Sequence, residues 1–222
     1  MKTNSEIRTE ARSLMSGNWG SAVATMLTYS IIVGGITFTT AFIGAIVETQ
    51  IGDTHGSLTR LLEIPITLFI LYPFAFSLVL LFIGFVRGEN RLSVGGIFKA
   101  FNSPHYLNSI GVYFFVSLFT TLWTMLFIIP GIVKSLSYAL APYILADNPE
   151  LSANEAIDES IAMMDGHKMD LFLMQLGYAA LAMLSLLALG IPLLWLDPYY
   201  KVVYAKFYEE VKAEYNGTIA TE

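Results

Sequence analysis

The sequence predicts an all-α protein, a polytopic membrane helical bundle of about six transmembrane helices arranged as three hairpins with amphipathic cytoplasmic lead-in helices. Two observations on composition carry this prediction. Of the 222 residues 55% are hydrophobic and only 14% are charged, whereas soluble domains contain about 25% charged residues. The segments 21–47 and 64–86 contain no charged residue, and about 20 apolar residues are enough for a helix to cross a bilayer.

The third observation is a recurring Ile-Pro pair, at Ile64-Pro65, Ile129-Pro130 and Ile191-Pro192. Each pair is followed by tyrosine and then by a charged cluster, and such self-similarity indicates a repeat. We therefore expect a single integral membrane domain, 1–222, with repeat-like units of about 1–90, 91–150 and 151–215 and a short polar C-terminal tail. The expected spans are 21–47, 64–86, 107–129, 131–146, 170–190 and 193–208. The fourth and sixth are short, so tilted, re-entrant or interfacial positions stay open for them.

A lead-in helix is expected before each odd-numbered span. Thr3-Asn4-Ser5-Glu6 and Ser152-Ala153-Asn154-Glu155 each fit a capping box, in which the first side chain caps the helix and the glutamate reaches back. Gly17 and Gly166 follow at the same distance and suit a helix end with positive φ. The loop 91–103 is a shorter relative. Such helices lie at the membrane surface or against the bundle.

The distribution of basic residues predicts that both termini are cytoplasmic. Excess Lys and Arg mark cytoplasmic loops, and the side of the N-terminus carries Lys2, Arg8, Arg12, Arg87, Arg91, Lys99, Lys168, Lys206 and Lys212. Only Arg60 lies clearly on the opposite side. The net charge of −6 argues against nucleic acid as a partner. Because cysteine is absent, there is no disulfide and no cysteine-based metal site.

Three stretches resemble a bacterial integral-membrane family, number 975 of the domains of unknown function: EARSLMSGNWGSAV, LFIIPGIVKSLSYALAPYILADNPELSANEAIDES and MMDGHKMDLF. The resemblance runs over nearly the whole chain and is sharpest at 127–172. It implies a multi-pass protein of the bacterial cytoplasmic membrane and supplies no catalytic residue. The chain is similar, more distantly, to the membrane portion that precedes some glycerophosphodiester phosphodiesterases. We do not expect their catalytic barrel here, because it would need about 250 further residues.

Three charged residues near the Ile-Pro turns are candidates for a polar site: Lys134, Asp197 and Lys201. Charges inside a membrane segment point by default to a function. For Lys134 we favour an interfacial side chain that reaches the headgroups, with a cation in a polar cavity as the alternative. Asp197 and Lys201 are four residues apart and share a helix face. A structural ion pair, between these two or between Asp197 and Lys134, is favoured over a solute or proton site.

The remaining motifs favour packing over chemistry. Tyr200, Tyr204 and Tyr208 form a stripe that suits packing or the aromatic belt, with a ligand groove as the alternative. Small residues around Gly177 allow helices to approach closely. His55, His105 and His167 lie in three different loops, and no pair has the spacing of metal ligands. We expect no metal, no cofactor and no enzymatic activity.

Two functions follow, and the first is a non-enzymatic scaffold, regulator or envelope-protective factor that acts through contacts. Its partners would be membrane lipids and another membrane or cytoplasmic protein, with a homo-oligomer left open. The contact surface would include Glu155, Asp158 and Glu159 on the acidic lead-in, and their replacement by serine should then abolish copurification of a partner. The alternative is a small-solute transporter or channel with a polar site near Lys134, Asp197 and Lys201. Convergence of these three side chains on one cavity would favour the alternative.

Overall fold

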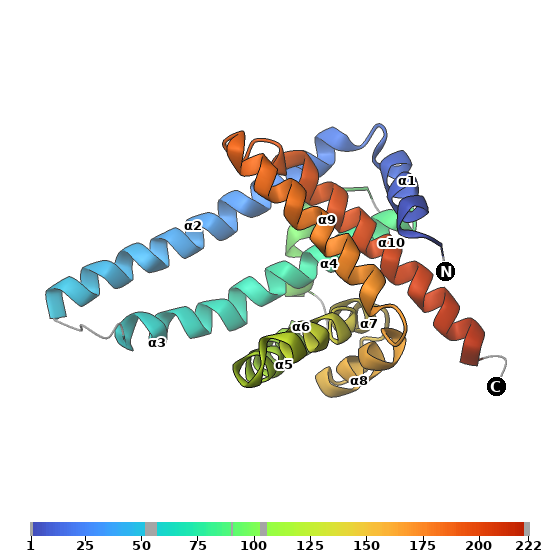
Figure 1. Cartoon of the computed structure of the whole chain (residues 1–222). Helices are drawn as coiled ribbons and strands as arrows, with labels where there is room; N and C mark the ends of the chain where they lie inside the picture. The colour runs from blue at the N-terminus through green and yellow to red at the C-terminus, as the bar shows by residue number, and fades with distance from the viewer. Residues whose placement is uncertain (1, 52–56, 90, 103–105, 220–222) are drawn as a thin grey trace.

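A computed structural model describes residues 2–51, 57–89, 91–102 and 106–219. These ranges contain helices and no strand (Figure 1). The elements are α1 (Asn4–Met15), α2 (Trp19–Ile51), α3 (Ser57–Ile66), the π-helical turn η1 (Thr67–Leu71), α4 (Tyr72–Val86), the 3₁₀ helix η2 (Val94–Asn102), α5 (Tyr106–Leu126), α6 (Ile128–Ser137), α7 (Ala141–Asp147), α8 (Ala153–Met163), α9 (Lys168–Leu187) and α10 (Leu193–Ile219).

Five helical segments of the described chain are long and apolar enough to cross a membrane. They are Trp19–Gln50, Thr59–Val86, Tyr106–Leu126, Ile128–Asp147 and Lys168–Leu187. The all-helical class is therefore confirmed, the five apolar helices suggest a membrane-embedded protein, and the number of six spans stays a prediction. The predicted sixth span lies in α10, whose apolar run is interrupted by Asp197, Lys201 and Lys206. This helix also continues to Ile219, so most of the expected polar tail is helical.

At two places, a proline makes the second helix of a pair differ from the span that the sequence predicts. The second helix of the first hairpin begins at Ser57 rather than near residue 64, and Pro65 lies inside α3. A proline inside a helix removes one backbone hydrogen bond and crowds the preceding turn, and the π-helical turn η1 follows directly. The fourth span is divided into α6 and α7, because Pro142 in the first turn of α7 has no N–H to continue the helix.

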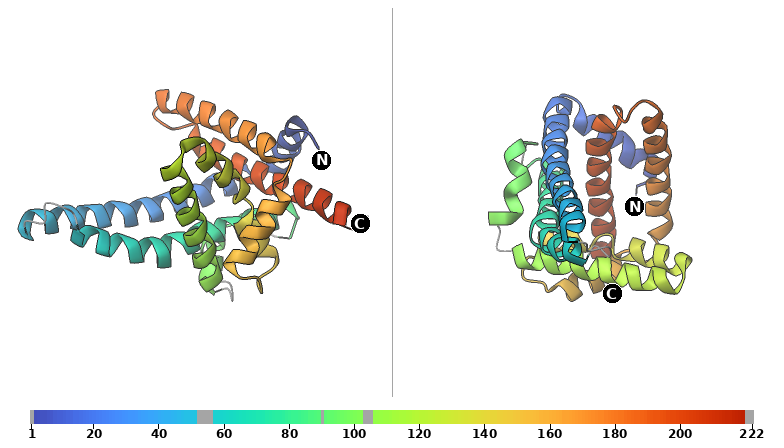
Figure 2. Two further views of the ribbon diagram at one scale, coloured as in Figure 1. Left: turned by 60° about the horizontal axis from the view of Figure 1, so that its bottom comes forward. Right: turned by 90° about the vertical axis from the view of Figure 1, so that its left-hand side faces the viewer.

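The three helix pairs do not lie side by side. In Figure 1, α2 runs down to the left and α10 runs down to the right, and in the right-hand view of Figure 2 α5 and α6 run across the molecule. Within each pair the helices pack on one another: α2 on α3, α5 on α6 and α9 on α10. The pairs therefore diverge from a shared base, and each has an outer end that projects away from it (Figure 1).

Each lead-in packs on the last helix of a repeat-like unit. The 3₁₀ helix η2 packs on α4, α8 packs on α7, and α1 packs on α10. Each lead-in thus covers the last helix of the unit before it, and the first lead-in covers the last helix of the chain. This cyclic order is what a threefold repeat would produce, although the repeat itself stays a prediction.

The capping boxes of the two longer lead-ins are confirmed. The Thr3 and Ser152 side chains accept from the amides of Glu6 and Glu155, and each glutamate accepts from the backbone of its cap. Gly17 and Gly166 have φ of +80° and +81°, the left-handed region that glycine occupies at little cost. Both helices bury one face against the bundle, including Ile7, Ala11 and Met15 in α1 and Ala156, Ser160 and Met163 in α8.

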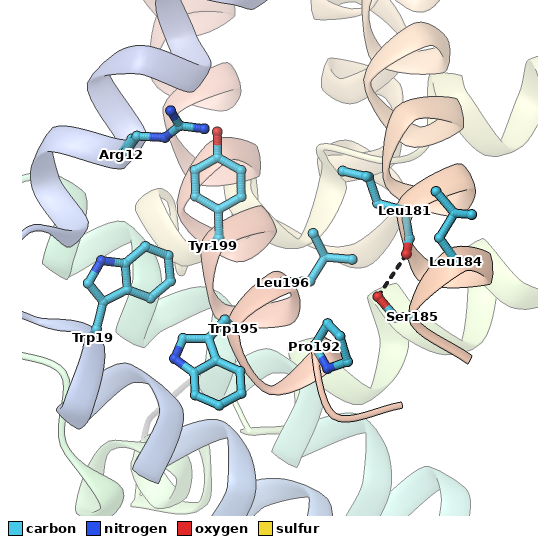
Figure 3. Close-up of a pocket in the computed structure, with 9 residues that line it drawn as sticks. All are labelled: Arg12, Trp19, Leu181, Leu184, Ser185, Pro192, Trp195, Leu196 and Tyr199. Atoms are coloured by element: carbon cyan, nitrogen blue, oxygen red, sulfur yellow. Dashed lines mark hydrogen bonds between the residues drawn. The ribbon is translucent and has the colours of Figure 1, made fainter. Parts of the chain in front are cut away.

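Ion pairs hold α1 on α10, and an aromatic contact holds the first residue of α2 on α10. Glu10 lies 2.7 Å from Lys2 and 3.1 Å from Lys206, and Lys2 also lies 2.9 Å from Glu210. The ammonium groups of Lys2 and Lys206 lower the pKa of Glu10 below its ordinary value. At the other end, Trp19 stacks on Tyr199 with ring centroids 6.4 Å apart (Figure 3).

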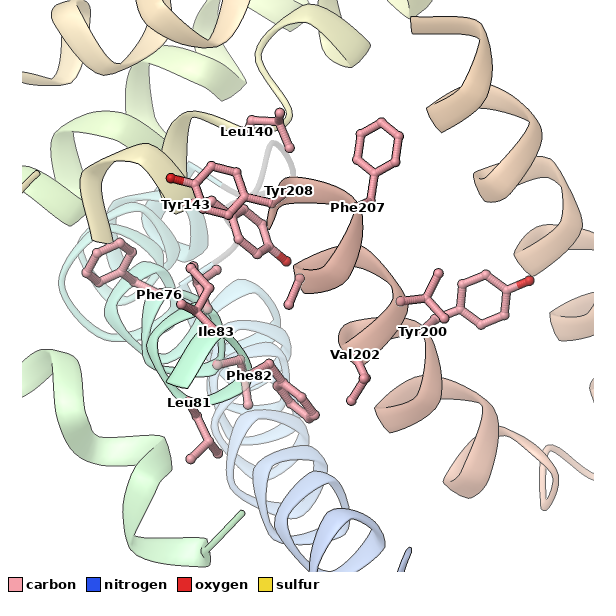
Figure 4. Packing of buried hydrophobic residues seen from close by; sticks show 14 of the residues in the cluster. Phe76, Leu81, Phe82, Ile83, Leu140, Tyr143, Tyr200, Val202, Phe207 and Tyr208 are labelled. Atoms are coloured by element: carbon pink, nitrogen blue, oxygen red, sulfur yellow. The ribbon is translucent and has the colours of Figure 1, made fainter. Parts of the chain in front are cut away.

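The hydrophobic core lies in the base, around α4, α7 and α10. Phe76 and Phe82 of α4, Leu145 of α7 and Phe207 of α10 are almost completely buried, and Figure 4 shows α4 and α10 side chains facing one another. By contrast, many large apolar side chains of α2, α5, α6 and α9 are exposed. The base is therefore packed like a soluble core, while the projecting helices present the apolar surface that a bilayer would cover.

Candidate functional site

A cavity of about 630 Å³ lies where the three helix pairs meet, and we call it the tyrosine cavity. Side chains from α2, α4, α5, α7, α9 and α10 line it, together with the link between α6 and α7. The lining residues are Met26, Val79, Tyr113, Val116, Tyr138, Ala139, Pro142, Tyr143, Met174, Gln175, Tyr178, Asp197, Tyr200, Lys201 and Tyr204. Because every pair contributes, the cavity exists only when all three units are packed together.

Six tyrosines make the wall partly aromatic and partly polar. Tyr143 stacks on Tyr204 at 5.7 Å, and Tyr178 meets Tyr200 edge to face at 4.7 Å between ring centroids. Two members of the tyrosine stripe on α10, Tyr200 and Tyr204, thus line a cavity. Tyrosine rings offer apolar faces, and their hydroxyl groups can donate and accept. Such a wall suits a ligand with both apolar and polar parts.

Asp197 and Lys201 both line the tyrosine cavity, but they do not form the ion pair that the sequence favoured. The Asp197 carboxylate accepts a 2.6 Å hydrogen bond from the hydroxyl of Tyr178. Lys201 is an exposed side chain on the cavity wall, and it makes no hydrogen bond or ion pair with any described residue. The Asp197 carboxylate, one turn away on α10, attracts this ammonium group without forming an ion pair with it, so the N–H donors of Lys201 are open to an anionic group of a ligand.

A cluster of charged residues at the base joins the C-terminal ends of α4 and α7 to the second half of α10, and sequence reasoning missed it. The Asp147 carboxylate accepts two hydrogen bonds from the Arg87 guanidinium, at 2.7 and 2.8 Å. It also accepts from the Tyr208 hydroxyl at 2.7 Å and from Lys212, and Arg87 donates to Glu209 at 2.8 Å. We call these five residues the Asp147 cluster. The available signal was that each unit ends in a charged segment.

The model of one protein family matches residues 1–138 and again residues 125–215, and its description is "Protein of unknown function (DUF975)". The chain belongs to the DUF975 family. This confirms the resemblance seen in the sequence. No curated protein and no solved structure matches the chain. The DUF975 description names no reaction or ligand, so the function of this member has to be argued from its geometry.

Lys134 of this DUF975 chain lies outside the tyrosine cavity. Its ammonium group lies 5.3 Å from the centroid of the Trp123 ring, on the neighbouring helix α5. A cation over an indole face is stabilised by about 0.5–1 kcal/mol at exposed sites. The structure therefore brings Asp197 and Lys201 together on one cavity and leaves Lys134 on the hairpin of α5 and α6.

The residues of the predicted contact surface on α8 are not equally available, because one of them caps the helix. Glu155 is held by the capping box, and hydrogen bonds from Ser152 lower its pKa. Asp158 is exposed and Glu159 is half-buried. Asp158 and Glu159 can therefore contact a partner without breaking the capping box of α8.

Histidine does not form a metal centre in the described part of this chain. His167 lies 3.7 Å from Glu214, whereas His55 and His105 lie outside the described residues. Among the residues that the structure places, no group of three His, Cys, Asp or Glu side chains is arranged to hold a metal ion.

Proposed function

We propose that this DUF975 protein is a membrane transporter or channel that binds a small solute through an anionic group in the tyrosine cavity. The observation that carries the proposal is Lys201, whose side chain lines the tyrosine cavity and donates no hydrogen bond to any described residue. An ammonium group on a wall of mostly apolar and aromatic side chains costs free energy unless its hydrogen-bond donors are satisfied. An anionic ligand group that accepts hydrogen bonds from Lys201 would offset this cost and add to the attraction of Asp197.

The cavity walls support the same proposal. Gln175 donates a 3.2 Å hydrogen bond to the Tyr204 hydroxyl, so polar groups from α9 and α10 are already oriented toward one another. Asp197 is held by Tyr178 one turn of α10 away from Lys201. The α10 helix therefore carries both charges of the cavity on one face, and movement of α9 against α10 would expose or cover them.

The test is solute flux in proteoliposomes, with chloride, phosphate, acetate and glutamate as the probes. We expect Lys201→Met to reduce flux of the transported anion at least tenfold, because about 1.4 kcal/mol of lost binding corresponds to that factor. Lys134→Leu is the matched control, since it removes the same charge outside the cavity, and it should leave flux unchanged. Equal flux in the Lys201→Met protein, or no protein-dependent flux of any probe, would refute the proposal.

The contact function predicted from the sequence stays a second proposal. Asp158 is exposed, and neither Asp158 nor Glu159 forms an ion pair with another described residue. Since Glu155 caps α8, the serine test is cleaner with Asp158 and Glu159 alone. Loss of a copurifying protein in that double variant would support a contact surface on α8.

A further inference from the structure

A second cavity, of about 520 Å³, lies between the junction of α1 and α2 and the pair α9 and α10, and we call it the arginine groove. Figure 3 shows Arg12 and Tyr199 at one end of the groove, with Leu181 and Leu184 of α9 across from them. Trp19 and Trp195 form the remaining side. The groove is therefore basic at one end and apolar along the rest of its length.

Arg12 of α1 lines the basic end of the groove, and Arg8 lies one turn before it on the same helix. Arg8 and Arg12 are four residues apart on one face of the helix, and neither forms an ion pair with a described residue. The Nε atom of Arg8 is buried and has no hydrogen-bond partner. The other basic residue at this end of the chain, Lys2, is paired with Glu10 and Glu210.

The surroundings of Arg8 explain why it points toward α9. Gly177 leaves room for it: a Cβ atom at that position would lie 2.9 Å from Arg8 Nη2 and 3.5 Å from the Tyr200 hydroxyl. Asp197 of α10 lines the tyrosine cavity and accepts a hydrogen bond from Tyr178. The positive charge at this end of the groove is thus not balanced by α9 or α10.

The apolar part of the groove is open to its surroundings. The side chain of Leu184 is 61% exposed and that of Trp195 is 47% exposed, which in a membrane protein means contact with lipid. Tryptophan is enriched where the hydrocarbon meets the headgroups. Tyr199, which lies with Arg12 at the basic end of the groove, is about 9 Å along α10 from the first residue of that helix. The basic end of the groove and the tip of the α9–α10 hairpin therefore lie at different depths.

We propose that the arginine groove binds one anionic phospholipid of the surrounding bilayer. The phosphate accepts hydrogen bonds from Arg12, the positive charge of Arg8 one turn away attracts it further, and one acyl chain lies along Leu181, Leu184 and Leu196. Arginine suits this role because its guanidinium binds phosphate through two parallel hydrogen bonds. The opposite charges of the phosphate and the two arginines select a lipid over an apolar protein helix, and the exposed leucines select a lipid over free phosphate.

The test is native mass spectrometry of the detergent-purified full chain mixed with equal amounts of dioleoyl phosphatidylglycerol and dioleoyl phosphatidylcholine. We expect one phosphatidylglycerol to be retained about tenfold more than phosphatidylcholine, the factor typical of one charge-assisted hydrogen-bond set. Arg12→Gln should remove this preference. Arg91→Gln is the matched control, because Arg91 is exposed and lies outside the groove, and it should keep the preference.

Two further variants separate the parts of the proposal. Leu184→Gln, at an exposed position that should not disturb folding, is expected to lower retention of phosphatidylglycerol severalfold. Lys201→Met should leave it unchanged, so the result does not depend on the tyrosine cavity. Equal retention of both lipids, an unchanged preference in Arg12→Gln, equal binding of free glycerol phosphate, or a bound polypeptide in place of lipid would overturn the proposal.

Discussion

At the scale of single residues, the contacts of a charged side chain matter more than its position in the sequence. Asp147 is the last residue of α7, where a negative charge meets the negative end of the helix dipole and is unfavourable. The structure compensates by placing Arg87, Lys212 and the Tyr208 hydroxyl around it. The carboxylate is only 7% exposed, so these partners replace most of its water.

Asp147→Asn tests whether this cluster stabilises the base. The change leaves Arg87 and Lys212 without their shared counter-ion, and we expect the free energy of unfolding to fall by about 2–3 kcal/mol. Thermal unfolding of the purified protein in detergent micelles measures the loss. Asp165→Asn is the control, because Asp165 is 87% exposed and exposed ion pairs contribute little. Equal melting temperatures for the two variants would contradict a structural role for the cluster.

At the scale of the elements, glycines set how closely the projecting helices pair. A Cβ atom on Gly131 of α6 would lie 2.7 Å from the Cα of Thr124 on α5, and one on Gly44 of α2 would clash with Thr59 of α3. Backbone atoms cannot move away as the end of a side chain can. The α5–α6 pair therefore depends on the missing side chain, as close helix pairs in membranes commonly do.

Gly131→Ala should separate α5 from α6 and reduce the free energy of unfolding by about 1–3 kcal/mol, the usual cost of overpacking. Gly34→Ala in α2 is the matched control, since no atom lies within 4 Å of its added Cβ. Alanine there should leave stability unchanged or raise it by up to about 1 kcal/mol through helix propensity. Unfolding of both variants in micelles decides the point, and equal stability would show that the contact is relaxed elsewhere.

At the scale of the whole molecule, the three hairpin ends differ in polarity. The first has charged and polar residues on both sides of its turn, such as Glu48 and Glu63. The other two turns, within 125–133 and 186–196, contain no charged or hydrogen-bonding side chain except the indole of Trp195. Met125, Leu187 and Leu189 are 79%, 85% and 89% exposed. Apolar turns this exposed are suited to hydrocarbon rather than to water.

Cysteine labelling can locate these turns, because the chain contains no cysteine of its own. We expect a membrane-impermeant maleimide added to intact cells to label Gln50→Cys rapidly. Ile129→Cys and Leu189→Cys should react at least tenfold more slowly than Gln50→Cys in intact cells. After denaturation in SDS, all three cysteines should react at the same rate. Equally fast labelling at all three positions would mean that every hairpin emerges on the far side, as six complete spans require.

The sequence by itself determined the all-helical class, the capped ends of α1 and α8 and the apolar runs long enough to cross a membrane, because these depend on neighbouring residues. A capping box such as Ser152 with Glu155 closes over three residues, and an apolar run is long enough or not whatever surrounds it. Only the tertiary structure decided which charges meet. Asp147 finds Arg87 and Lys212, and Lys201 enters a cavity while Lys134 lies on Trp123. These outcomes depend on how separate helices pack, and no local pattern encodes the direction in which each helix pair leaves the base.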